Sequence, residues 1–126
     1  MFKEIVISTI IVISIICLDF VTQNYTKESI EQTSEMLTDL KDKLNKGENN
    51  ISDNLNKIII SWDERRNKLA YYIEHDELEK VDTNLTNLKS YIEVSDFYMA
   101  ISSIDETEYI LDHIKQKNSF SLENVF

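Results

Sequence analysis

The chain has 126 residues, with 23 acidic and 13 basic side chains and a formal net charge of −10. This charge argues against nucleic acid and against anionic lipid headgroups as partners, because both repel an acidic protein. With no proline, one glycine and one cysteine, the chain lacks the turn residues of a β-rich domain, a glycine-rich phosphate loop and an intramolecular disulfide bond.

The N-terminal part of the chain carries an uncharged apolar run over residues 5–18. A helix needs about 20 apolar residues to cross a bilayer. Residues 1–21 reach that length if Lys3 snorkels to one interface and Asp19 lies at the other. We therefore predict a transmembrane anchor over residues 1–21, followed by a helical domain over residues 22–126.

Two other interpretations of this run remain open. A cleaved secretory signal peptide has an apolar core of about 7–15 residues, and a lipoprotein signal would end at Cys17. No small-x-small cleavage site follows the run, and Ile16 stands where a lipoprotein signal has a small residue. The helical pattern also continues directly after Asp19 instead of breaking. These features favour an uncleaved anchor.

The orientation of the anchor follows from its flanks. Lys3 is the one basic side chain before the run, and Lys27 lies close behind it. Lysine and arginine near the ends of a span favour the cytoplasmic side, and the N-terminal flank is too short to be translocated as a domain. We predict a single-pass protein of the cell membrane, with its N-terminus inside and an extracytoplasmic domain over residues 22–126.

After the run, apolar residues recur at helical spacing in four segments. This pattern predicts an all-α fold: an N-terminal transmembrane helix, a bundle of two antiparallel hairpins (about four helices) and a short C-terminal turn. The first helix is expected to continue from the anchor and to stop at Gly47, because glycine accepts the left-handed conformation that ends helices. The second helix is expected to run from near Ser52 to near His75.

The third and fourth helices have their own start signals. Asp76 is the expected N-cap of the third, with Glu79 three residues later as in a capping box. The fourth is expected to start at Ser95 or Asp96. The apolar positions predicted to face the core are Ile30, Met36, Leu37, Leu40, Leu44, Leu55, Ile58, Ile59, Trp62, Leu69, Ile73, Leu78, Val81, Leu85, Leu88, Ile92, Phe97, Ala100, Ile101, Ile104, Leu111 and Ile114.

The tail over residues 118–126 is too apolar to remain free in solution. It opens with a serine that can cap a turn. We expect it to pack on the bundle as a short turn or to dock on a partner. The residues predicted to contact such a partner are Phe120, Leu122, Val125 and Phe126.

His75, Asp76 and Glu77 form the densest group of ionisable side chains and include the ligand types of a divalent metal site. Zinc sites usually need three or four soft or imidazole ligands at set spacing. A carboxylate-bridged iron site needs a Glu-x-x-His pair on each of two helices. Tyr72 and Ile110 stand three residues before the two histidines, which excludes the iron site. We predict a helix-capping turn without a metal or other cofactor, and His75, Asp76 and Glu77 are the candidate ligands if a metal binds.

Motifs for covalent catalysis are missing, so an enzyme is not expected. The one thiol, Cys17, lies in the apolar run, and no serine stands in a Gly-x-Ser-x-Gly turn. Trp62 occupies a core position of the second helix, and Arg65 and Arg66 are expected on a solvated face. Four tyrosines are expected at the edges of the apolar stripes, with half-buried rings: Tyr72, Tyr91, Tyr98 and Tyr109.

The order of these features resembles that of a known family. The features that carry the resemblance are the short anchor, Trp62, the His75-Asp76-Glu77 turn, Leu85-x-x-Leu88-x-x-Tyr91-Ile92 and the closing Ser121-Leu122-Glu123-Asn124. The chain resembles a domain-of-unknown-function family of small, N-terminally anchored helical proteins from anaerobic spore-forming Gram-positive bacteria. The resemblance implies a helical fold, no established activity and a small integral membrane protein as a neighbour or partner.

Two functions are compatible with the sequence. The first is an accessory or scaffold subunit that binds an integral membrane partner through the anchor and the bundle. The alternative is an extracytoplasmic ligand or metal sensor that uses the acidic His75-Asp76-Glu77 turn. The oligomeric state is left open by the sequence.

Overall fold

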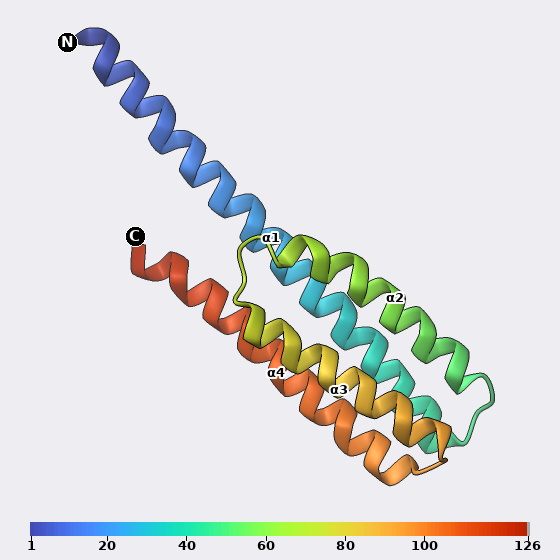
Figure 1. The fold of residues 1–126 in the computed structure, drawn as a ribbon. Coiled ribbons are helices and arrows are strands. Elements are labelled where there is room, and N and C mark those ends of the chain that lie inside the picture. The colour runs from blue at the N-terminus through green and yellow to red at the C-terminus, as the bar shows by residue number, and fades with distance from the viewer. Residues whose placement is uncertain (126) are drawn as a thin grey trace.

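The helices of the protein lie side by side along one long axis, and the first extends far beyond the others (Figure 1). The computed structural model describes the backbone of residues 1–125 and the side chains of residues 1–119. Within these limits the chain is all-α, without a strand. The helices are α1 (Phe2–Lys46), α2 (Ile51–Leu69), α3 (His75–Glu93) and α4 (Phe97–Val125).

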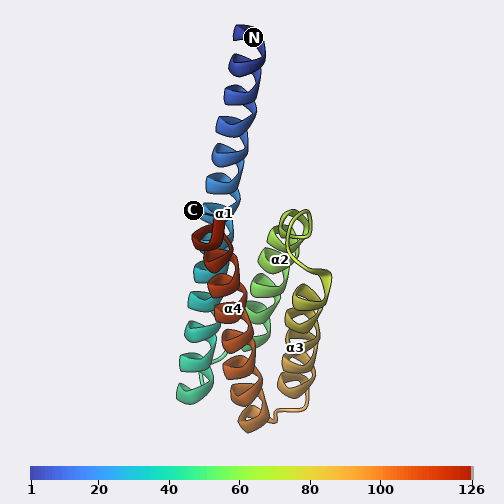
Figure 2. The same ribbon diagram turned by 90° about the vertical axis from the view of Figure 1, so that its left-hand side faces the viewer.

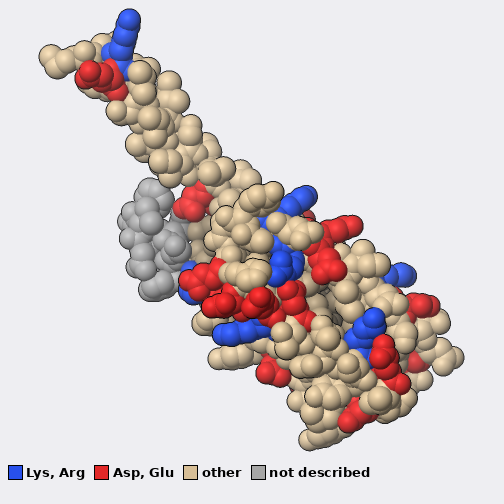
Figure 3. All heavy atoms as spheres, in the orientation of Figure 1, with Lys and Arg blue, Asp and Glu red and all other residues tan. Residues whose placement is uncertain are grey.

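The N-terminal part of α1 is apolar and fully exposed. No residue from 1 to 18 is buried, and Ile5 and Ile15 are 64 % and 61 % exposed. Figure 3 shows this part of α1 as a tan rod, with charged atoms at its tip and over the bundle. In the described part of the chain, α1 is the one helix whose length and composition suit a membrane span, and a signal sequence has the same composition.

Two polar side chains within this apolar rod are hydrogen-bonded to the helix itself. The hydroxyls of Thr9 and Ser14 each donate to a carbonyl one turn earlier, at 2.8 Å. Such internal hydrogen bonds remove the cost of placing a hydroxyl where no water is available. Two of the three hydroxyls between residues 5 and 18 are thus paired within the helix itself.

The same helix then supplies one wall of the bundle core. Its first buried residue is Thr26, and Ile30, Leu37 and Leu44 follow at seven-residue spacing, with exposed fractions of 2 %, 0 % and 6 %. Residues 2–46 contain neither proline nor glycine, so nothing in the sequence interrupts the helix. The prediction that the first helix continues from the apolar run is confirmed.

Gly47 ends α1 as predicted. Its φ of 66° is left-handed, its N–H donates to Leu44, and the N–H of Glu48 donates to Lys43 at 3.1 Å. This pair of hydrogen bonds is the Schellman arrangement, which satisfies carbonyls that the end of a helix leaves open.

The core is built from the predicted apolar stripes of all four helices. Trp62 is its largest side chain, at 1 % exposure. Phe97 is the exception among the predicted positions, since it is 41 % exposed at the start of α4. The buried apolar residues are Ile30, Leu37, Leu40, Leu44, Leu55, Ile58, Trp62, Leu69, Leu78, Val81, Leu85, Leu88, Ile92, Ala100, Ile104, Leu111 and Ile114.

The helices form the two predicted antiparallel hairpins, α1–α2 and α3–α4, and α1 also packs against α4. This topology gives the bundle two distinct ends (Figures 1 and 2). At the anchor-side end, α1 leaves the bundle beside the α2–α3 connection (residues 70–74) and the last turns of α4. The α1–α2 and α3–α4 connections lie at the opposite, far end.

Two predicted helix boundaries are wrong. α2 ends at Leu69 and not near His75, because residues 70–74 form a turn in which Ile73 folds back against the core. α3 begins at His75, and its N-cap is Glu74 and not Asp76. The carbonyl of Glu74 accepts the first N–H groups of α3, from Glu77 and Leu78.

The predicted C-terminal turn is also wrong. α4 continues as one helix to Val125. Residues 97–125 contain no proline or glycine, and the serine expected to cap a turn is instead a helical residue. The fourth helix does start where predicted, since the Asp96 carboxylate accepts a hydrogen bond from the N–H of Met99 at 3.2 Å.

The packing of the core makes a direct prediction about stability. Leu88 is 0 % exposed, so Leu88→Ala removes buried apolar atoms and leaves a cavity. We expect the free energy of unfolding to fall by about 2–5 kcal/mol, measured by urea denaturation in detergent with circular dichroism. The matched control is Ile60→Ala at a 60 % exposed position, where the change stays within about 0.5 kcal/mol. Equal effects of the two substitutions would contradict the assigned core.

Candidate functional site

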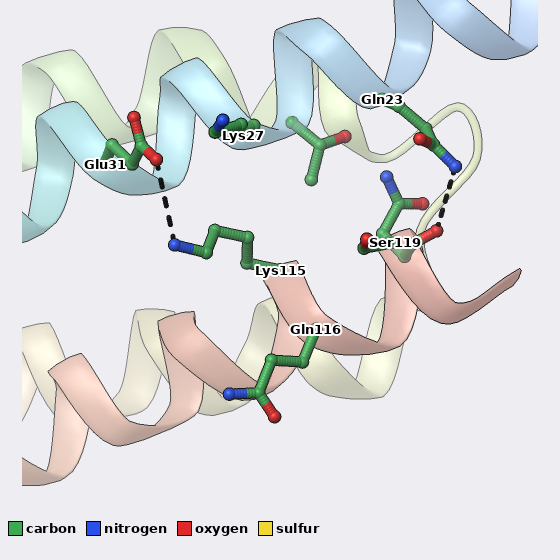
Figure 4. Close-up of a pocket in the computed structure, with 8 residues that line it drawn as sticks. Gln23, Lys27, Glu31, Lys115, Gln116 and Ser119 are labelled. Carbon is green, nitrogen blue, oxygen red and sulfur yellow. Dashed lines mark hydrogen bonds and ion pairs between the residues drawn. The ribbon is translucent and has the colours of Figure 1, made fainter. Parts of the chain in front are cut away.

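A cleft of about 520 Å³ lies between α1 and α4, at the anchor-side end of the bundle. Figure 4 shows α1 on one side and α4 on the other. The cleft is open to solvent, and the residues that line it are all of polar or charged type. The residues that line it are Gln23, Thr26, Lys27, Glu31, Lys115, Gln116, Asn118 and Ser119.

Two polar contacts cross this cleft and set its width. The Gln23 side-chain amide donates to the carbonyl of Asn118 at 3.2 Å, and Lys115 Nζ lies 3.7 Å from Glu31 Oε1. In Figure 4, Lys115 reaches from α4 toward α1, whereas Gln116 points away. The lining offers amides, hydroxyls and opposite charges, but no thiol or imidazole. Such a surface suits binding through hydrogen bonds and ion pairs.

A second feature of this end ties the α2–α3 connection to α1. The hydroxyl of Tyr72 donates to the carbonyl of Thr22 at 3.0 Å and lies 2.7 Å from the Thr26 hydroxyl. Thr26 Oγ1 also lies 2.8 Å from the same carbonyl. Burial raises the pKa of Tyr72 above 10.0, and the hydrogen bond with Thr26 opposes part of this shift. The connection is thereby fixed at the level of Thr22 on α1.

The predicted metal-ligand candidates do not converge on one point. Nε2 of His75 lies 2.9 Å from Glu79, whereas Glu77 faces α4, with His113 at 3.6 Å and Lys117 at 3.3 Å. The hydrogen bond to Glu77 raises the pKa of Lys117. Over the residues whose side chains are described, no group of three His, Cys, Asp or Glu is placed to hold a metal ion. The contacts of Glu77 join α3 to α4. The ligand or metal sensor therefore stays a prediction.

The structure describes the backbone, but not the side chains, of most of the predicted partner-contact residues. The backbone of α4 carries three of the four, and it ends beside the exit of α1 from the bundle (Figures 1 and 2). The side chains of Phe120, Leu122, Val125 and Phe126 lie outside the described residues. Their role as partner contacts therefore stays a prediction.

A polar cluster around Asp82 is absent from the predictions. Asp82 accepts a hydrogen bond from Trp62 Nε1 at 2.8 Å and pairs with Arg66 at 2.6 Å. Arg65 donates to Ser29 Oγ at 3.0 Å and to the side chain of Gln32. The prediction that Arg65 and Arg66 lie on a solvated face is therefore wrong. Arg66 links α2 to α3, and Arg65 links α2 to α1.

The tyrosine predictions divide in the same way. Tyr91 is half-buried against the core as expected, whereas Tyr72 is 38 % exposed and bonds to α1 through its hydroxyl. Tyr98 and Tyr109 are 84 % and 76 % exposed, so their predicted positions at the edges of the apolar stripes are wrong. Both lie on α4.

Fold and site together define a class of protein: an α-helical bundle whose first helix extends into a long apolar segment. Comparison with known families gives one match. Residues 20–125 match the family described as domain of unknown function (DUF4363), and the chain belongs to this family. The match starts where the apolar run ends and covers the bundle. No curated protein and no solved structure matches the chain.

The tie between Tyr72 and α1 makes a pH-dependent prediction. Tyr72→Phe removes the hydroxyl, and we expect it to lower the free energy of unfolding by about 1 kcal/mol at pH 8. The raised pKa of Tyr72 stabilises the folded state fully below pH 10.0, the ordinary pKa. This contribution is lost as the pH rises through the raised pKa. The gap between wild type and variant should therefore narrow above pH 10.0.

Urea denaturation in detergent at several pH values measures this gap. The matched control is Tyr98→Phe, which changes a tyrosine that is 84 % exposed at the far end of the bundle. It should leave the free energy of unfolding unchanged at every pH measured. A gap for Tyr72→Phe that stays constant through the alkaline range would show that Tyr72 titrates alike in the folded and unfolded states.

Proposed function

We propose that the protein is a membrane-anchored accessory or scaffold subunit that binds an integral membrane partner and has no catalytic role of its own. The observation that carries the proposal is the continuity of α1 (Phe2–Lys46), which joins the exposed apolar rod to the bundle core without a break. In this proposal the rod spans the cell membrane with its N-terminus inside, and the bundle is extracytoplasmic.

The exposure of the rod supports insertion in a membrane. Residues 5–18 are uncharged and mostly apolar around the whole helix, and they are covered by nothing in the bundle. Apolar surface exposed to water is unfavourable by about 25 cal/mol per Å², and a bilayer removes that cost. A helix that is apolar on all sides suits lipid better than a protein groove, which would cover one face.

The unbroken helix also supports binding to a partner in the same membrane. A bundle on a flexible linker samples many heights and orientations, whereas a bundle that continues its own anchor holds one face toward a neighbour. The anchor-side end then presents the α1–α4 cleft and the end of α4 close to the membrane. We propose these two surfaces, with Phe120, Leu122, Val125 and Phe126, as the contact region.

Two substitutions at one exposed position test whether the straight helix matters. Val21 is 61 % exposed, so neither substitution touches the core. Val21→Pro removes a backbone hydrogen bond and kinks the helix at a cost of about 3 kcal/mol or more, whereas Val21→Ala keeps it straight. We expect recovery of the membrane partner, after crosslinking in native membranes and detergent extraction, to fall several-fold with Val21→Pro and to stay unchanged with Val21→Ala.

Further measurements make this test decisive. Both variants should still unfold in one cooperative thermal transition well above the temperature of the crosslinking, so that the kink and not unfolding causes the loss of partner. Removal of residues 120–126 should also lower recovery. The proposal fails if the wild-type chain is extracted alone, or if Val21→Pro recovers as much partner as Val21→Ala.

A further inference from the structure

We infer that the α2–α3 connection, residues 70–74, is a second membrane contact, in which Tyr71 inserts its ring among the lipid headgroups. This inference rests on the proposed insertion of the apolar rod. It adds a lipid-binding surface to the bundle itself, separate from the partner surfaces. The argument depends on the height of the connection, the exposure of Tyr71 and the charges around it.

The height of the connection follows from its hydrogen bonds to α1. Tyr72 bonds the carbonyl of Thr22, which lies four residues after Leu18, the end of the uncharged run. At a rise of 1.5 Å per residue, this is about 6 Å along the helix. The headgroup region on each side of a bilayer is about 5–8 Å thick. With the run in the hydrocarbon, the connection therefore lies at headgroup depth.

The chemistry of the connection suits that depth. Tyr71 is 89 % exposed, next to Tyr72, whose hydroxyl holds the connection in place. Tyrosine is enriched at membrane interfaces, because its ring fits against acyl chains while its hydroxyl bonds headgroups or water. An exposed ring on a turn that is fixed by its neighbour can enter the interface with little further loss of conformational freedom.

The charges near the connection allow this approach despite the acidic bundle. Glu74, the carboxylate within the connection, lies 3.5 Å from Lys117. On the other side of Tyr71, the Lys68 ammonium lies 5.7 Å from the centre of the Tyr25 ring. The Glu74 carboxylate is thus paired, and the Lys68 ammonium lies close by. The membrane that suits this connection is a zwitterionic bilayer, because it has no net charge to repel the acidic bundle.

Tyr98 provides a matched control within the same chain. It is 84 % exposed, close to the value for Tyr71, and it follows the α3–α4 connection at the far end of the bundle. The two tyrosines therefore differ in their position along the bundle axis and hardly in exposure. A contact that depends on height above the membrane must separate them.

Spin labels in the full chain test the inference. With Cys17→Ser as background, single labels are introduced through Ile10→Cys, Tyr71→Cys and Tyr98→Cys, and the protein is placed in phosphatidylcholine nanodiscs. Power saturation then gives the collision rates with oxygen and with a water-soluble nickel chelate. We expect the label at position 71 to collide with the chelate at least threefold less often than the label at position 98.

The label at position 10 separates the two proposals. If the label at position 10 collides often with oxygen and rarely with the chelate, the rod is inserted in the bilayer. Equal chelate collisions at positions 71 and 98 would then overturn the membrane contact of Tyr71 and leave the anchoring intact. If position 10 is open to the chelate, the anchoring fails, and this inference falls with it.

A second measurement keeps an aromatic ring at the tested position. Tyr71→Trp and Tyr98→Trp are compared in bilayers whose lipids carry bromine high on the acyl chains, which quenches nearby tryptophan fluorescence. Trp62 is 1 % exposed and common to both variants, so its emission cancels in the comparison. Stronger quenching for Tyr71→Trp supports the contact, and equal quenching overturns it.

Discussion

The rest of the structure depends on one stretch of backbone, residues 19–25 of α1, where the helix passes from its exposed apolar part to the bundle core. Thr22 and Thr26 each bond their hydroxyl to a backbone carbonyl earlier in α1, at 2.9 and 2.8 Å. The segment lacks the residues that break helices, and its partial burial begins before Thr26, the first buried side chain. One helix therefore satisfies two environments: apolar on every side first, then amphipathic with a single buried stripe.

This continuity explains why the anchor-side end carries the features of interest. The α2–α3 connection is bonded to α1 through Tyr72, and Asn118 of α4 accepts a hydrogen bond from Gln23. Both contacts use residues of α1 within two turns of the apolar run. A change in the direction of α1 would therefore move the cleft and the connection together with the apolar rod.

The sequence predicts the parts of this fold that rest on periodicity and on single residues. Apolar spacing identifies nearly the whole core, and Gly47 marks a helix end, because both signals are local. The N-cap of α3 is Glu74 and not Asp76, because residues 70–74 pack as a turn, and no local sequence pattern indicates that turn. The contacts of Tyr72 with Thr22 and of Trp62 with Asp82 join residues 50 and 20 positions apart. Polar pairs at such separations leave no periodic trace, so the candidate site could be located only from the structure.

The most direct test of this account is the distance between two labels on either side of the passage from rod to bundle. Ile13→Cys and Asp39→Cys, with Cys17→Ser, place spin labels 26 residues apart on α1. Double electron–electron resonance in nanodiscs should give one narrow distribution centred at about 39 Å, the length of 26 helical residues. A broad distribution centred well below that length would show that α1 breaks between the rod and the bundle, and would contradict the account.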